Sequence, residues 1–123
     1  LAARRFVRNA GMFLAGGPPP LARIAQSFGL NQTELGRLFG VSRQAASQWL
    51  EQGPPTGRAG KVNAVARLVD VLERNLRAER IPGIVREPAE AYGGLTMLEM
   101  IERDRHDELL RLVTAAFDWA TTA

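Results

Sequence analysis

The stretch QTELGRLFGVSRQAASQWLE, residues 32–51, decides how this chain folds. Apolar residues recur at helical spacing on both sides of Gly40, which predicts two short helices joined by a tight turn. Gly40 tolerates the positive φ that such a turn requires, and Gly36 is the small residue expected where the helices cross. The residues expected to be buried and to fix the second helix are Val41, Ala46 and Trp49. The spacing therefore predicts a helix-turn-helix unit.

Polar residues mark the start of each of the two helices. Asn31 precedes the first helix, and the Glu34 side chain can reach back to the Asn31 backbone N–H in a capping box. Ser42 is expected to cap the second helix, which runs from Arg43 to about Glu51 and stops before Gly53.

Working outward toward the N-terminus, residues 1–20 are predicted to be an arm or a helix that ends in a run of two glycines and three prolines. Because residue 1 is leucine, we expect further residues to precede it. A helix is predicted over residues 21–28, and it opens a helix-turn-helix domain that spans residues 21–80.

Toward the C-terminus, the apolar spacing predicts a long helix over residues 61–78, preceded by a flexible loop rich in Gly and Thr. Residues 81–94 are expected to be extended and rich in turns. Two more helices are predicted over 97–103, where Thr96 and Glu99 form a second capping box, and over 106–119. No segment alternates as a strand would, so the predicted fold class is all-α, with a small helical module at 81–123.

Composition and charge narrow the class of protein. Hydrophobic residues make up 46% of the chain, too many for a disordered protein, and no apolar run approaches the ~18 residues of a membrane helix. There is no cysteine, and we expect a cytoplasmic location. Residues 1–80 carry 12 Lys/Arg against 5 Asp/Glu, whereas residues 81–123 carry 4 against 8. The basic residues 1–80 can bind phosphate groups electrostatically, whereas the acidic residues 81–123 would be repelled by them.

The second helix of the unit offers side chains that suit a DNA groove. Arginine can donate two hydrogen bonds to guanine and glutamine can pair with adenine, each discriminating by roughly 1–3 kcal/mol. The predicted base-contacting residues are Arg43, Gln44, Ser47 and Gln48. The predicted phosphate-contacting residues are Gln32, Arg37, Ser42, Arg58 and Lys61. The alternative is an ordinary helical hairpin with a polar solvent face, or an adaptor that binds protein and never DNA.

The run Gln-x-x-Leu-Gly-x-x-Phe-Gly-Val-Ser, followed by Trp49, closely resembles the Xre-type, phage-repressor-like family. The resemblance covers about residues 21–76 and implies a phage-repressor-like helix-turn-helix bundle that binds double-stranded DNA. It implies that Arg43, Gln44 and Gln48 contact bases and that Gln32 contacts phosphate. Two residues depart from the family pattern: Gly36 replaces the usual Ala, and Ala46 replaces Val or Ile, so a closer helix crossing is expected.

The C-terminal part resembles the toxin-binding module of Xre/MbcA/ParS-type antitoxins, through YGGLTMLEMI at residues 92–101 and the final FDW at 117–119. The resemblance implies an antitoxin that represses its own operon and blocks a RES-domain toxin, an NAD-consuming enzyme. The implied partner-binding residues are Phe117, Asp118 and Trp119. The alternatives are a plain Xre-type regulator without a toxin, and docking of these aromatic residues on the core or in a homodimer interface. A homodimer is expected, because one recognition helix covers only a few base pairs.

Nothing in the sequence predicts catalysis. His106 is the only histidine, and the carboxylates near it lack a nucleophile, a phosphate loop or a metal cluster. We therefore expect no enzyme activity, no cofactor and no metal site.

Overall fold

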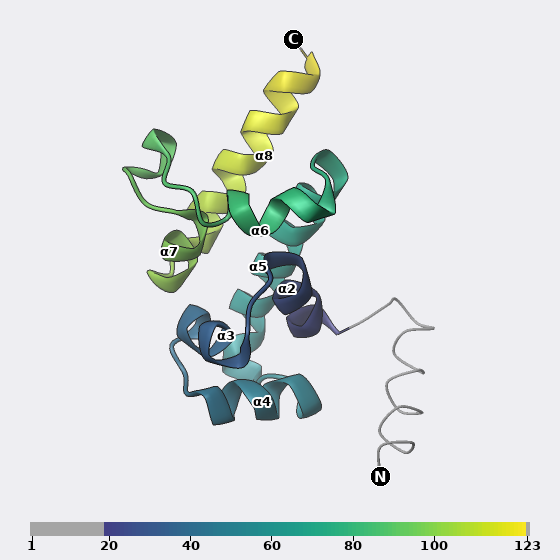
Figure 1. Cartoon of the computed structure of the whole chain (residues 1–123), viewed down its shortest axis with the longest axis vertical. Helices are drawn as coiled ribbons and strands as arrows, with labels where there is room; N and C mark the ends of the chain where they lie inside the picture. The colour runs from purple at the N-terminus through teal and green to yellow at the C-terminus, as the bar shows by residue number, and fades with distance from the viewer. Residues whose placement is uncertain (1–18, 123) are drawn as a thin grey trace.

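The computed structural model describes residues 19–122, and over that range it consists of helices and loops without a strand (Figure 1). The predicted all-α class is confirmed; the arm at residues 1–18 lies outside the described residues. No helix in the described range has the length and apolarity to span a bilayer. The α-helices are α2 (Pro20–Phe28), α3 (Gln32–Phe39), α4 (Arg43–Gln52), α5 (Thr56–Asn75), α6 (Ile81–Ile84), α7 (Met97–Glu102) and α8 (His106–Thr122), with short 3-10 turns η1 (Ala78–Arg80) and η2 (Glu90–Tyr92).

The caps predicted for α3 and α4 are present. The Asn31 side chain accepts a hydrogen bond from the Glu34 N–H at 2.8 Å, and the Glu34 carboxylate accepts one from the Asn31 N–H at 2.9 Å. Ser42 Oγ accepts from the Ala45 N–H at 3.1 Å. Gly40 lies between the helices with φ of 69°, the left-handed conformation that ends α3. The local signals in residues 31–52 thus produce the predicted pair of helices.

The prediction for the longest helix was wrong at both ends. α5 begins at Thr56 rather than Lys61 and ends at Asn75 rather than Ala78. Pro55 holds an extended conformation just before the helix, and its carbonyl accepts from the Arg58 N–H at 2.9 Å. Gly57 and Gly60 lie exposed within α5 and each disfavours the helix by about 1 kcal/mol relative to alanine, which is why this earlier start could not be predicted from helix propensity. At the other end, Leu76 turns to φ −130° and packs against the core.

The segment over residues 81–94 is rich in turns as predicted, but the prediction that it is extended was wrong. It contains the short helix α6 and the turn η2. Pro82 stands in the first turn of α6, where its missing N–H costs nothing, and Ile81 and Val85 are both fully buried one turn apart. α7 follows as predicted, with the Thr96–Glu99 capping box formed.

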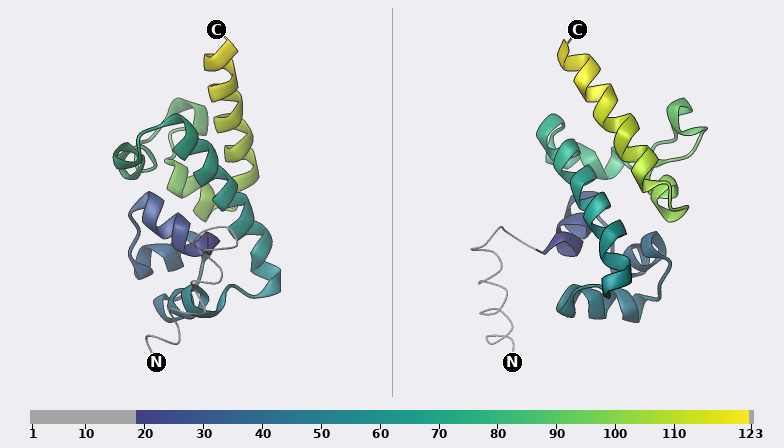
Figure 2. Two further views of the ribbon diagram at one scale, coloured as in Figure 1. Left: turned by 90° about the vertical axis from the view of Figure 1, so that its right-hand side faces the viewer. Right: turned by 180° about the vertical axis from the view of Figure 1, so that it is seen from behind.

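One hydrophobic core joins the two parts of the chain. α5 packs against α2 and against α8, and Figure 2 shows α5 and α8 crossing one another. Buried residues from both sides of residue 80 belong to one cluster, among them Val65 and Leu72 of α5 with Met100 and Leu109. Arg86 also connects the two parts by hydrogen bonds, because its guanidinium donates to the carbonyls of Phe28 at 2.7 Å and Gly29 at 3.1 Å. The residues on both sides of the predicted domain boundary at residue 80 therefore share one hydrophobic core.

Candidate nucleic-acid interface

α4 lies at the end of the molecule opposite to the C-terminal end of α8 (Figure 1). Its inner side is fixed by packing, because Ala46 is 1% exposed and Trp49 9%. Three of the four predicted base-contacting side chains, Arg43, Gln44 and Gln48, are exposed, and Ser47 is half-buried. We call these four residues the recognition edge. The helix thus keeps its polar edge in solvent while its apolar side is held by the core.

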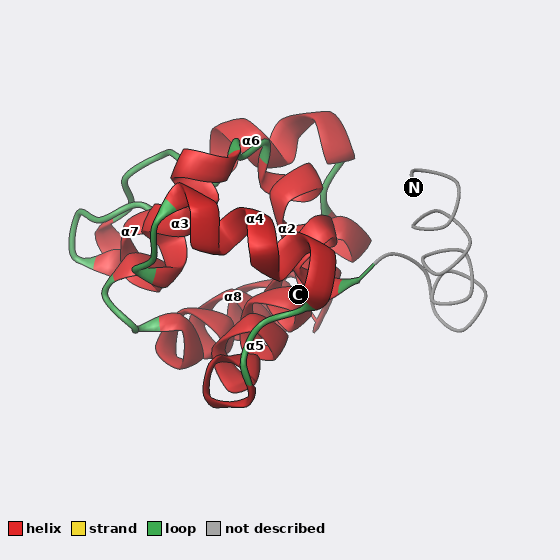
Figure 3. Cartoon of the chain, turned by 90° about the horizontal axis from the view of Figure 1, so that it is seen from below, coloured by secondary structure: helices red, strands yellow, loops and turns green. Residues whose placement is uncertain are grey.

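The position of α4 depends on a close approach at Gly36 of α3, and Figure 3 shows the two helices from below. A Cβ added to Gly36 would lie 2.6 Å from the Val41 carbonyl oxygen and 3.0 Å from that of Ser42. The Val41 N–H donates to the Gly36 carbonyl at 2.8 Å, which holds the turn against α3. The crossing therefore leaves no room for a methyl group.

Four of the five predicted phosphate-contacting residues are exposed, and three of them lie on α3 or at the start of α4. Arg37 lies in the last turn of α3 and Ser42 caps α4, so they stand on either side of the turn at Gly40. Gln32 is the first residue of α3, one helix length away from that turn. Backbone N–H groups at the start of α4 add partial positive charge beside Ser42.

The other two predicted phosphate residues, Arg58 and Lys61, lie against the C-terminal end of α3. Arg58 Nη1 donates to the Phe39 carbonyl at 2.7 Å, and its guanidinium lies 5.8 Å from the Trp49 ring centroid. Lys61 Nζ donates to the Leu38 carbonyl at 3.0 Å and lies 5.4 Å from the Phe39 ring centroid. Cations at a helix C-terminus stabilise its unpaired carbonyls. In this structure both side chains bond to the end of α3, and their predicted role as phosphate contacts stays a prediction.

Lys61 also connects α3 to the loop between α7 and α8. Its Nζ donates to Asp104 Oδ1 at 2.8 Å, and only 12% of the Lys61 side chain is exposed. The hydrogen bond from Lys61 lowers the pKa of Asp104, and the positive charge of Lys61 adds to that effect. Asp104 itself holds a φ of 60°, which is unusual for a residue other than glycine. Sequence reasoning missed this connection, because its members are 43 residues apart and neither belongs to a motif.

The predicted partner-binding residues lie near the end of α8. Phe117 is half-buried against the core and Asp118 is exposed, while the side chain of Trp119 lies outside what the structure describes. Leu112, at 36% exposure, is the large hydrophobic residue that the described chain leaves most open to solvent. The outer half of α8 extends past the rest of the bundle in each view of Figures 1 and 2.

Comparison of the chain with protein-family models, with curated proteins and with solved structures finds no match.

Proposed function

We propose that this protein is a sequence-specific DNA-binding regulator whose helix α4 enters the major groove. The observation that supports the proposal is the recognition edge: a row of arginine, glutamine and serine side chains, free of acids, on a helix whose opposite side is anchored by Ala46 and Trp49. A helix fits the major groove, where base edges present distinct donor and acceptor patterns.

Each part of the edge has a role in this proposal. Arg43, in the first turn of α4, donates to guanine O6 and N7, and Gln44 or Gln48 pairs with adenine. Arg37, Ser42 and Gln32 contact phosphates and fix the register of the helix on the duplex. A homodimer doubles this small footprint and reads two half-sites.

A selection from random duplexes, followed by titration of the winning duplex at increasing salt, tests the proposal. Counterion release counts only cationic phosphate contacts, and Arg37 from each copy of the homodimer supplies two, so a plot of log affinity against log salt is expected to have a slope of about −2 or steeper. The control is a scrambled duplex of the same composition, which the protein is expected to bind more weakly. Failure to enrich any sequence, together with affinity that does not change with salt, would instead favour a protein-binding adaptor.

We further propose that the protein is an antitoxin whose C-terminal part binds a RES-type toxin. Two observations favour this candidate over a regulator without a toxin. α8 ends away from α4 (Figure 1), so DNA and a protein partner would meet different parts of the molecule, and α8 exposes Leu112. The acidic balance of residues 81–123 also disfavours contact of this part of the chain with phosphate.

Leu112→Asp is expected to weaken neutralisation of a co-expressed RES-type toxin and to leave DNA affinity unchanged. A charge at an interface core removes apolar contact and leaves a desolvated carboxylate. Arg43→Ala is the matched control, with the opposite expected result: weaker DNA binding and unchanged neutralisation. If the wild-type chain neutralises no such toxin, the antitoxin candidate fails while DNA binding is unaffected.

A further inference from the structure

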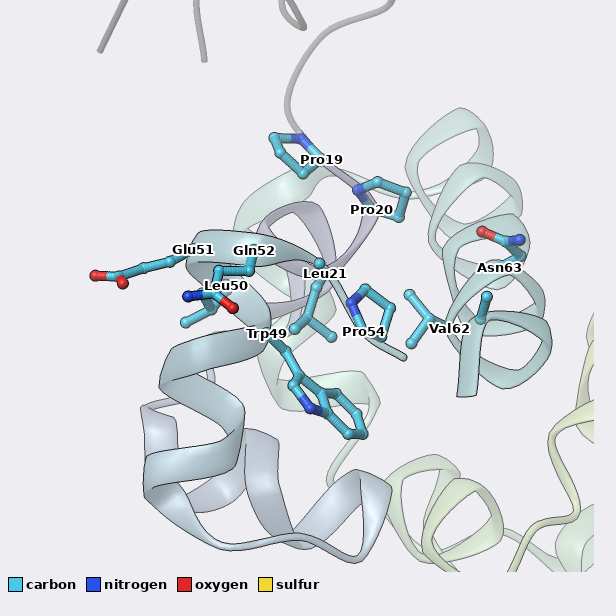
Figure 4. A pocket seen from close by; sticks show the side chains of 12 residues that line it. Pro19, Pro20, Leu21, Trp49, Leu50, Glu51, Gln52, Pro54, Val62 and Asn63 are labelled. Carbon is cyan, nitrogen blue, oxygen red and sulfur yellow. The ribbon is translucent and has the colours of Figure 1, made fainter. Parts of the chain in front are cut away.

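An apolar pocket of about 500 Å³ lies beside α4, where the start of α2, the end of α4 and the first turns of α5 meet (Figure 4). Core residues Leu21, Trp49 and Val62 form part of its wall, and Pro54 closes one side. Pro19 and Pro20 lie at its rim, and Pro19 is the first residue that the structure describes. Pockets of this size and apolar lining are typical of sites that bury a ligand.

We propose that this pocket receives the side chains of Phe13 and Leu14 of the same chain. These residues belong to Met12–Ala15, the most apolar run of residues 1–18, which is otherwise rich in arginine and glycine. Left in water, the run would expose a contiguous apolar surface next to an apolar pocket. Docking would remove the apolar surface of the run from water and would fill the apolar pocket.

The position of the run in the chain favours this occupant. Leu14 precedes Pro19 by five residues, so an extended chain reaches up to about 17 Å from the rim, more than the 8–10 Å between packed helices. Gly16 and Gly17 lie between them and permit the reversal of direction that docking requires. A short tether gives an effective concentration of about 1 mM, which a free peptide or a second copy would rarely match.

The docking itself does not depend on the proposed DNA binding, and it is tested without DNA.

The test uses the full chain with Trp119→Phe, which leaves Trp49 as the sole tryptophan and a direct reporter of the pocket. Acrylamide quenching and the indole N–H signal in NMR spectra are compared with and without Phe13→Asp and Leu14→Asp. Because Trp49 is only 9% exposed with the pocket open, the indole N–H signal is the primary readout; the aspartates are expected to shift it and to raise the quenching constant, since an occupied pocket excludes the remaining quencher and solvent. Ala2→Asp with Ala3→Asp adds the same charge outside the run, and no change is expected.

Two results would overturn the proposal. Equal quenching and an unmoved indole signal in the Phe13/Leu14 variant would show that these residues do not cover Trp49. Protection of Trp49 that disappears when the protein is diluted tenfold would assign the pocket to a second copy of the chain. Protection that is independent of dilution and lost only in the Phe13/Leu14 variant supports docking within one chain.

Discussion

Gly36→Ala is expected to destabilise the fold by about 2 kcal/mol, even though alanine is the better helix former by about 1 kcal/mol. The reason is the 2.6 Å separation between the added Cβ and the Val41 carbonyl oxygen. That oxygen belongs to the backbone of a turn, which the Val41 N–H and the Ser42 cap hold in place, so the clash is relieved only by moving α4. Alanine is also the residue usual in the Xre-type pattern, so this change toward the family pattern is expected to be harmful here.

Gly60→Ala is the matched control for this prediction. Gly60 is an exposed residue of α5, and a Cβ built there meets nothing within 4 Å. The same substitution is expected to stabilise the protein by up to about 1 kcal/mol, because it removes backbone freedom from the unfolded chain. Urea unfolding of both variants gives the free energies. Two changes of the same sign would contradict the proposed close crossing at Gly36.

The elements that could be predicted from the sequence are those whose signals are local. The Asn31–Glu34 and Thr96–Glu99 capping boxes each lie within four residues, and both form as expected. The turn at Gly40 could be predicted because it requires a positive φ, which glycine adopts without strain. The recognition edge follows from helical periodicity, because Ala46 and Trp49 define the buried side and leave the opposite side exposed.

The features that sequence reasoning missed depend on contacts between distant residues. Ile81 and Val85 are only one turn apart, a spacing too short to distinguish a helix from an irregular segment until the core that buries them is known. Arg58 and Lys61 look like free cations in the sequence, yet they lie over Trp49 and Phe39 and bond to the end of α3. No spacing rule places a cation against a helix end some twenty residues earlier.

Arg43→Ala is expected to lower affinity for the selected duplex roughly 5- to 150-fold, which corresponds to the 1–3 kcal/mol of one bidentate base contact. Arg43 is exposed in the first turn of α4, while the remainder of that helix is anchored by Ala46 and Trp49. The loss is expected to fall on the selected duplex far more than on a scrambled one, and to relax the preference at one base position. Fluorescence anisotropy with both duplexes at fixed salt measures the ratio.

Arg77→Ala controls for the loss of one positive charge. Arg77 is exposed and precedes η1, outside α3 and α4, so its removal is expected to leave the affinity ratio unchanged. If Arg43→Ala lowers the affinity for both duplexes equally, Arg43 contacts a phosphate and not a base. If it lowers the affinity for neither duplex, α4 does not contact the DNA.

Arg43→Lys separates the charge of Arg43 from its shape. Lysine keeps the positive charge but lacks the planar fork that donates two parallel hydrogen bonds to guanine. If the base contact is bidentate, the lysine variant keeps the salt dependence of the wild type but loses most of its preference for the selected duplex. If Arg43 acts only as a charge, lysine restores the wild-type affinity ratio. Because the Arg43 backbone begins α4 directly after the Ser42 cap, neither substitution disturbs the buried side of the helix, and the two outcomes reflect chemistry at the base edge alone.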